Sequence, residues 1–161
     1  NAYDNSIRYT DNFLARIIHL LKQQQVDASM LYTSDHGEDI FDDGRHLFLH
    51  ASPVPSYYQL HVPLLLWTSD SYREEYPGIE KAASMNRQKN ISSSISFFQT
   101  MMELAGIETP YRNDSLSVTS PLYTEKSRVY LNDHNEPHSL DDIGMRKEDF
   151  EMLKKRGIDA Q

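Results

Sequence analysis

Apolar residues in the first part of the chain recur every three or four positions. Between positions 3 and 25 they stand at Ile7, Leu14, Ile17, Ile18 and Leu21. Phe13 and Leu20 widen this stripe. A stripe of this period is typical of an amphipathic helix, so the pattern predicts a long helix over 3–25 with one face against a sheet.

Three shorter segments have the pattern of β-strands. The segments ASMLYTS (28–34) and SRVYLND (127–133) are short, β-compatible and bounded by polar residues. In HVPLLLWTS (61–69) the apolar run is almost unbroken. Such a run is typical of a strand that is buried on both faces, so it favours a parallel sheet.

Two further helices are expected in the second half of the chain. The segment ISSSISFFQTMMELAGI (91–107) has a helical pattern, with Ser92 or Ser93 suited to the N-cap and Gly106 suited to the end. A terminal helix is expected over 147–156. Helices thus alternate with strands, which indicates an α/β fold.

The polar segments between these elements are predicted to be loops. Positions 38–60 contain charged residues, a glycine and two prolines, so a long loop is predicted there. Positions 71–90 are polar and are predicted to be an excursion on the surface. The segment 132–142 contains His134 and His138, but the proline between them argues against a helical metal site, so a polar loop is expected. The 161 residues fit one domain.

Charge and composition exclude several classes of function. The net charge of −8 and the lack of a Lys/Arg cluster exclude a nucleic-acid partner. Without cysteine the chain has no internal disulfide and no thiolate metal site. The longest apolar run, VPLLLW, is too short for a membrane span, and the polar start does not have the pattern of a signal peptide. Because the chain opens without methionine, directly in a helical pattern, we expect a fragment or a processed product.

Candidate metal chemistry lies directly after the first predicted strand. Asp35 and His36 stand at its carboxyl end, where open α/β sheets bind ligands. Carboxylate oxygen and imidazole nitrogen are suitable ligands for zinc or a similar divalent ion. Both side chains can reach one ion only if the chain leaves extended geometry, which Gly37 permits. Glu38 could orient one of the ligands. A simple turn is the alternative, and spacing alone does not choose among the histidines further along the chain.

Three motifs in fixed order resemble one enzyme superfamily. SDHGED, FLHAS and QLHVPLLLW resemble the sulfatase-like branch of the alkaline phosphatase superfamily, with the greatest similarity to the membrane-bound phosphoethanolamine transferases. The opening helical segment and the segment ending in LAGI match in their places, so the resemblance covers about the first 107 residues. It implies an α/β fold with a mostly parallel sheet flanked by helices, of which this chain, 1–161, is the C-terminal portion.

The resemblance also implies roles for three residues. In that family the Asp-His pair of the motif binds the catalytic zinc, which makes Asp35 and His36 metal ligands. The histidine of the second motif binds the phosphate group or a second metal, which makes His50 the catalytic residue. The acidic residues of the following loop, Asp39, Asp42 and Asp43, are expected to be solvated.

The sequence departs from the family in two places. Ala51 follows His50 where the family has glycine, and Ser94 and Ile95 stand where many relatives have a His-Asp pair. The family's threonine nucleophile and carboxylate ligand lie upstream of the helix that opens this chain. The resemblance therefore implies half of an active site, and an isolated chain without activity.

The implied reaction is metal-dependent transfer of phosphoethanolamine from phosphatidylethanolamine to lipid A or another envelope glycan. The implied cofactor is zinc, with calcium or another divalent metal as the alternative. The partners would be a phospholipid donor and a sugar-phosphate or glycan acceptor, on the periplasmic side of an inner membrane reached through an N-terminal anchor outside this chain. A sulfatase that hydrolyses sulfate esters is one alternative, and a catalytically silent fragment is another.

Overall fold

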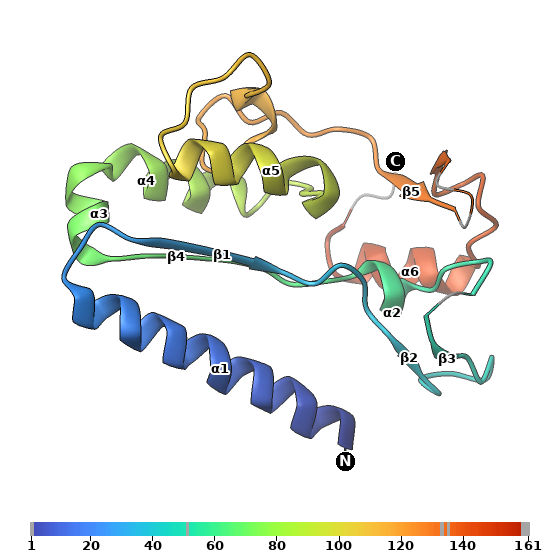
Figure 1. Ribbon diagram of the computed structural model, residues 1–161. Coiled ribbons are helices and arrows are strands. Elements are labelled where there is room, and N and C mark those ends of the chain that lie inside the picture. The colour runs from blue at the N-terminus through green and yellow to red at the C-terminus, as the bar shows by residue number, and fades with distance from the viewer. Residues whose placement is uncertain (1, 51, 133, 135, 159–161) are drawn as a thin grey trace.

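The computed structural model describes residues 2–50, 52–132, 134 and 136–158 (Figure 1). Its elements follow in the order α1 (Ala2–Gln24), β1 (Ser29–Thr33), β2 (Asp39–Ile40), β3 (Phe48–Leu49), α2 (Tyr57–Leu60), β4 (Leu64–Thr68), α3 (Asp70–Glu75), α4 (Pro77–Asn86), α5 (Ser93–Leu104), the 3-10 helix η1 (Asp114–Leu116), β5 (Val129–Leu131), β6 (Pro137–Ser139) and α6 (Lys147–Lys155). The α/β class is confirmed, and each predicted helix and strand is present; the first helix is shifted by one position and the other elements are shorter than predicted.

A two-stranded ribbon of β1 and β4 lies at the centre, with α1 on one side and α4 and α5 on the other (Figure 1). The two strands are antiparallel, with Ser29 opposite Thr68 and Thr33 opposite Leu64. The other two strand pairs of the described residues, β2–β3 and β5–β6, are also antiparallel. The expected parallel pairing is therefore wrong for these strands.

The connection between β1 and β4 explains the antiparallel pairing. Parallel neighbours need a crossover, usually through a long helix. In the described residues of this connection the elements are the β2–β3 hairpin and the four residues of α2, and the chain turns back along β1. Leu65 in β4 is 39% exposed, so the apolar run is not buried on both faces as its pattern suggested.

Helix α1 confirms the predicted helix, but its apolar stripe is only partly covered. Ile7, Phe13 and Leu20 are each more than half exposed, and no residue of α1 is fully buried. The expected packing against the sheet is thus realised only in part. Of the helices in the described ranges, none has the length and apolar character needed to cross a membrane.

The segment after β4, expected as a polar surface excursion, is mostly exposed but folds into helices α3 and α4, which were not predicted. Ser69 caps α3 by accepting a hydrogen bond from the backbone of Tyr72, whose hydroxyl donates to the carbonyl of Leu104 at 2.7 Å. Asn86 at the end of α4 is buried and donates to the carbonyls of Val118 and Ser120. Polar residues here serve as internal anchors, which their composition alone did not reveal.

A hydrophobic core lies where the C-terminal part meets α2. Tyr57, Leu140, Met145 and Leu153 form its buried cluster. The segment expected as a polar loop contributes β6, in which His138 pairs with Tyr130 of β5; positions 133 and 135 of that segment lie outside the described residues. This core fixes α6 against α2 (Figure 1).

A buried ion pair ties α6 to the loop that follows β1. Asp149 of α6 is 1% exposed, and its two oxygens accept hydrogen bonds from Arg45 at 2.6 and 2.9 Å. Asp149 also accepts from the backbone amide of Tyr57 at 2.9 Å. On its other side Arg45 donates to Asp43 at 2.8 Å. Residues about one hundred positions apart thus hold the loop and the start of α2 together.

The substitution Asp149→Asn is expected to lower the free energy of unfolding by about 3 kcal/mol, because it leaves the guanidinium of Arg45 without one of its buried charged partners. Urea unfolding followed by circular dichroism measures the loss. Asp141→Asn, on an exposed residue, is the matched control and should change stability by less than about 0.5 kcal/mol. Equal, small effects of both substitutions would contradict the anchoring role.

Acid should weaken the same network. The hydrogen bond from Arg45 lowers the pKa of Asp43 to about 2, below its ordinary 3.8. A carboxyl whose pKa is lower in the folded than in the unfolded state contributes stability above the unfolded value, and this contribution is lost as the pH falls from about 4 to about 2. Unfolding measured across this range should therefore depend less steeply on pH in Asp43→Asn than in the parent chain; an unchanged slope would refute the assignment.

Candidate metal centre

The site begins where β1 ends and the chain meets helix α2. The amide of Gly37 donates to the carbonyl of Gln59 at 2.8 Å. A Cβ atom at Gly37 would overlap the carbonyl oxygen of Tyr58. Glycine is needed here because the backbone of α2 lies against it, rather than because the turn needs an unusual conformation. This contact fixes the direction in which the residues beside Gly37 point.

Asp35 and His36, the two predicted metal ligands, converge after β1. The Asp35 Oδ2 and His36 Nε2 atoms are 3.7 Å apart. Two ligand atoms on one tetrahedral zinc, each at its usual bond length, are about 3.4 Å apart, so a small movement would let both bind one ion. The predicted pair therefore has a spacing that fits a divalent metal.

Local hydrogen bonds orient the side chains of Asp35 and His36 and leave one potential ligand atom free on each. The Nδ1 atom of His36 lies 3.0 Å from the carbonyl of Gly37, which can only accept, so Nδ1 carries the proton and Nε2 has its lone pair free. The Oδ1 atom of Asp35 accepts from the amide of His36 at 3.0 Å, which leaves Oδ2 free. This amide hydrogen bond also lowers the pKa of Asp35, so the carboxylate is ionised at neutral pH.

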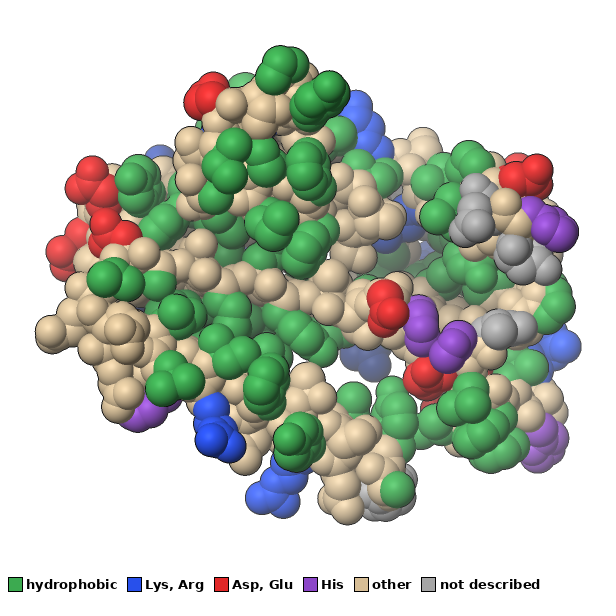
Figure 2. All heavy atoms as spheres, in the orientation of Figure 1, with side chains coloured by type: hydrophobic (Ala, Val, Ile, Leu, Met, Phe, Trp, Pro, Cys, Tyr) green, Lys and Arg blue, Asp and Glu red, His purple; other side chains and the backbone are tan. Residues whose placement is uncertain are grey.

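His50, the predicted catalytic residue, comes from the end of β3 and lies beside His36. The two imidazole rings are 4.0 Å apart between centroids. The Nδ1 atom of His50 donates to Glu38 Oε1 at 2.9 Å, and Glu38 Oε1 is 3.8 Å from His36 Nδ1. Figure 2 shows two histidine side chains next to each other on the surface, with acidic side chains beside them.

Glu38 therefore has a larger part in the site than the sequence indicated. His36, Glu38 and His50 form a group whose potential ligand atoms lie within 4.8 Å of one another. The second oxygen of Glu38, Oε2, is buried and has no hydrogen-bond partner among the described residues. A buried carboxylate oxygen without a partner favours a cation or a proton donor from a ligand.

Buried polar residues behind the site hold this loop on α2. Asp39 is 2% exposed. Its carboxylate accepts hydrogen bonds from the hydroxyl of Ser56 at 2.6 Å and from the side-chain amide of Gln59. Ser56 is also the N-cap of α2.

The expectation that the acids of this loop are solvated is wrong for Asp39, which is bonded to α2. Asp42 is exposed as expected, and Asp43 is 35% exposed while it pairs with Arg45. The partners of Asp39 lie 17 and 20 positions along the chain, so local composition could not identify them.

The hydroxyl groups beside the motif are engaged with the backbone. Thr33 donates to the carbonyl of Pro63 at 2.9 Å, and Ser34 donates to the carbonyl of His36 at 2.7 Å.

Of the other histidines, His61 follows α2 and pairs with the hydroxyl of Tyr57 at 2.7 Å. Ala51, one of the departures from the family motif, lies outside the described residues.

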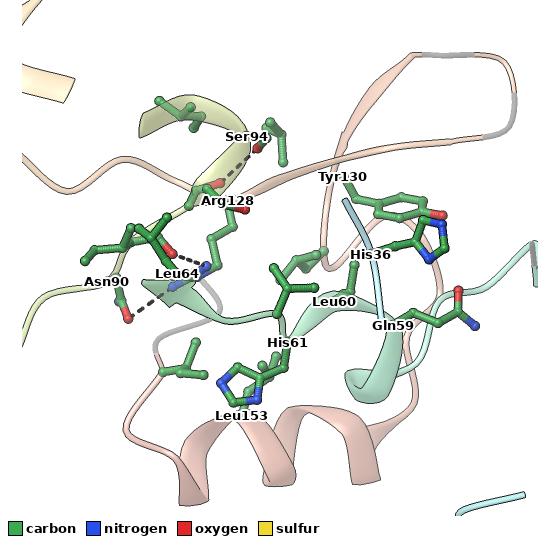
Figure 3. Close-up of a pocket in the computed structure, with 18 of the residues that line it drawn as sticks. His36, Gln59, Leu60, His61, Leu64, Asn90, Ser94, Arg128, Tyr130 and Leu153 are labelled. Carbon is green, nitrogen blue, oxygen red and sulfur yellow. Dashed lines mark hydrogen bonds between the residues drawn. The ribbon is translucent and has the colours of Figure 1, made fainter. Parts of the chain in front are cut away.

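The site opens into a cavity of about 1280 Å³. Asp35, His36 and His50 line one part of it. The N-terminal end of α5, including Ser94 and Ile95, lines another. In Figure 3 the labelled His36 lies beside Tyr130, while Ser94 and Arg128 lie on the other side of Leu60. The cavity is large enough for a ligand well beyond a single phosphate group.

The chain is similar to known proteins of one family. A family model described as Sulfatase matches residues 1–107. Phosphoethanolamine transferase EptA of Salmonella typhimurium is 33% identical over 126 residues, which are 75% of this chain and 22% of that protein. The chain thus spans less than a quarter of that relative.

Two solved structures have the same fold. The crystal structure of the C-terminal periplasmic domain of EcEptC from Escherichia coli superposes with a TM-score of 0.69 at 27% identity, over 79% of this chain and 35% of that one. The same domain in complex with Zn gives 0.68 at 24% identity, over 91% and 40%. The fold is therefore sulfatase-like, and the chain belongs to the sulfatase family.

Proposed function

We propose that this chain supplies part of the active site of a metal-dependent transferase, which moves phosphoethanolamine from a phospholipid to lipid A or another envelope glycan. The observation that carries the proposal is the convergence of Asp35 Oδ2 and His36 Nε2 at 3.7 Å. It occurs in a chain whose relatives include a phosphoethanolamine transferase. This relationship favours transfer over the hydrolysis of sulfate esters.

Zinc is the proposed metal, because one EptC domain of this fold was solved as a zinc complex and because an oxygen and a nitrogen ligand suit it. Asp35 and His36 would hold the ion through Oδ2 and Nε2. Bound zinc would lower the pKa of a hydroxyl nucleophile and neutralise charge on the phosphoryl oxygens. Catalytic zinc normally has three protein ligands, so further ligands are proposed to come from outside this chain.

The nucleophile is also proposed to lie outside this chain. Thr33 and Ser34 are the hydroxyl residues nearest the motif, and both donate to backbone carbonyls. A hydroxyl that is held as a donor to a carbonyl lacks the general base or metal contact that activates a nucleophile. A threonine upstream, as in the family that the motifs resemble, fits this role better.

His50 is proposed to bind the phosphoryl group. Its Nδ1 proton is held by Glu38, which fixes the ring and leaves Nε2 directed away from that contact. As an imidazolium it can donate from Nε2 to a phosphoryl oxygen and stabilise the negative charge that develops there. Glu38 is then the residue that positions His50. By analogy with the EptC domains, the reaction is proposed to take place in the periplasm.

The first test is the zinc content of this chain after dialysis, measured by elemental analysis beside the double variant Asp35→Ala, His36→Ala. We expect bound zinc in the parent and a loss of at least about tenfold in affinity in the variant, because both ligand atoms are removed. The double variant Asp11→Ala, His19→Ala, which removes the same residue types from exposed positions of α1, is the control. Equal zinc in all three proteins would contradict the proposed centre.

Glu38→Gln separates the two possible roles of Glu38. If Glu38 positions His50, the variant should keep the zinc stoichiometry of the parent, because Asp35 and His36 are unchanged. Transfer by the full-length protein that contains this chain should fall about tenfold or more, because the amide does not hold the Nδ1 proton as a carboxylate does. Loss of one zinc per chain in Glu38→Gln would instead assign His36, Glu38 and His50 to a metal.

A further inference from the structure

The hydroxyl of Ser52 lies beside the candidate metal centre and has no role in the proposed function. Ser52 stands two positions after His50, and two residues of extended chain span at most about 7 Å between Cα atoms. Both residues line the cavity together with Asp35 and His36. A serine in a loop commonly stabilises a turn, so its hydrogen bonds decide whether the hydroxyl can serve another purpose.

The other hydroxyl groups near the metal ligands are already engaged. Thr33 and Ser34 donate to backbone carbonyls, and Ser56 donates to the carboxylate of Asp39. Within the described ranges, no side chain or backbone group forms a hydrogen bond with the hydroxyl of Ser52. The donor of Ser52 is therefore not used inside the described part of the protein.

A role in its own turn does not account for Ser52. A serine that stabilises a turn accepts a hydrogen bond from the backbone amide two or three residues later. The third residue after Ser52 is Pro55, which has no amide hydrogen. The amide of Val54, two residues later, makes no hydrogen bond to Ser52 in the described structure. The hydroxyl is thus free for a partner in the cavity.

The backbone that carries Ser52 is stiff. Pro53 follows directly, and a proline restricts the residue before it to extended conformations. Pro55 and Ser56 are almost completely buried, and Ser56 is the N-cap of α2, the helix whose backbone contacts Gly37. The segment that presents Ser52 is therefore anchored to the same helix as the turn after β1. A donor held in this way loses little conformational entropy when it binds a ligand.

A free hydroxyl next to His50 suits the oxygens of a tetrahedral anion. In the proposed function His50 supplies one donor, from Nε2, whereas an ionised phosphoryl group has several oxygens that can only accept hydrogen bonds. A serine hydroxyl provides one further donor without adding a charge. Hydrogen bonds to an ionised acceptor are stronger than those between neutral groups, so a single hydroxyl can have a measurable effect.

We propose that Ser52 is a second hydrogen-bond donor, beside His50, to the anionic tetrahedral group that reacts at this site. The inference deepens the proposed function and rests on it for the identity of that group as phosphoryl. Ser52 acts as a donor and not as the nucleophile. A nucleophilic hydroxyl needs a base or a metal to accept its proton, and no base among the described residues is in hydrogen-bond contact with Ser52.

The substitution Ser52→Ala tests this role in the zinc-loaded, full-length protein that contains this chain. Calorimetry with inorganic phosphate should show an affinity about tenfold lower than in the parent, because one hydrogen bond to a charged acceptor is lost. The value of kcat/KM for phosphoethanolamine transfer should fall by about tenfold or more for the same reason. Ser52→Thr keeps the hydroxyl on a residue that tolerates extended backbone, so it should stay within about threefold of the parent.

Ser93→Ala is the matched control, because Ser93 also lines the cavity but stands at the start of α5. It should bind phosphate as the parent does. The zinc content and the thermal midpoint of Ser52→Ala should equal those of the parent, since the lost hydroxyl has no partner in the described structure. Equal phosphate affinity in Ser52→Ala and Ser93→Ala would overturn the proposal. So would a Ser52→Thr variant as weak as Ser52→Ala, or a lowered midpoint in Ser52→Ala with unchanged phosphate affinity.

The two measurements separate this inference from the proposed function. Loss of phosphate affinity in Ser52→Ala, in a protein that transfers no phosphoethanolamine, would reject the proposed function and support the role of Ser52. Transfer that continues in Ser52→Ala at the rate of the parent, with the same affinity for phosphate, would support the proposed function and reject the role of Ser52.

Discussion

The contact between Gly37 and helix α2 is the constraint on which the site depends. Because the carbonyl of Tyr58 occupies the space of a side chain at Gly37, the loop and the helix approach more closely than any other residue would allow. The amide bond to Gln59 and the buried hydrogen bonds of Asp39 hold this approach in place. The chain is thereby turned sharply after β1, so Asp35 and His36 present their ligand atoms together.

The C-terminal part of the chain supports this contact from outside the region that matches the family model. That match ends at position 107, whereas Asp149 lies in α6 and bonds both to Arg45 and to the start of α2. Separating such a buried carboxylate from its charged and amide partners would leave uncompensated buried groups, so the pair holds the elements around it together. The loop that carries His50 is therefore held by two helices, α2 and α6, which lie far apart in the sequence.

Features with a local cause were predictable from the sequence. The helices at 2–24 and 93–104 follow from apolar periodicity, and the strands at 29–33 and 64–68 follow from short apolar runs. Strand direction was not predictable in this way, since it depends on the connection, and an unbroken apolar run does not by itself imply parallel pairing. Helices α3 and α4 were missed because they are anchored by polar residues whose partners lie about thirty positions away.

The same distinction applies to the site. The residue types and the motif indicated Asp35, His36 and His50, and the structure brings these three side chains together, but whether they bind metal remains a prediction. The contact of Glu38 with His50 joins residues 12 positions apart and was not visible from spacing. The burial of Asp39 was missed for the same reason, because its partners in α2 are 17 and 20 positions away.

Electrostatics then constrains what such a site can bind. A chain with a net charge of −8 repels phosphates at long range, and Asp35 adds a negative charge at the centre itself unless a cation offsets it. A phosphorylated substrate therefore needs positive charge both at the reacting group and at any second phosphate that it carries. In the proposed centre, His36 and His50 with a metal would meet the need at the reacting group. Because the turn after β1 brings Asp35 and His36 together, the same turn would also set the charge that the proposed centre presents to a substrate.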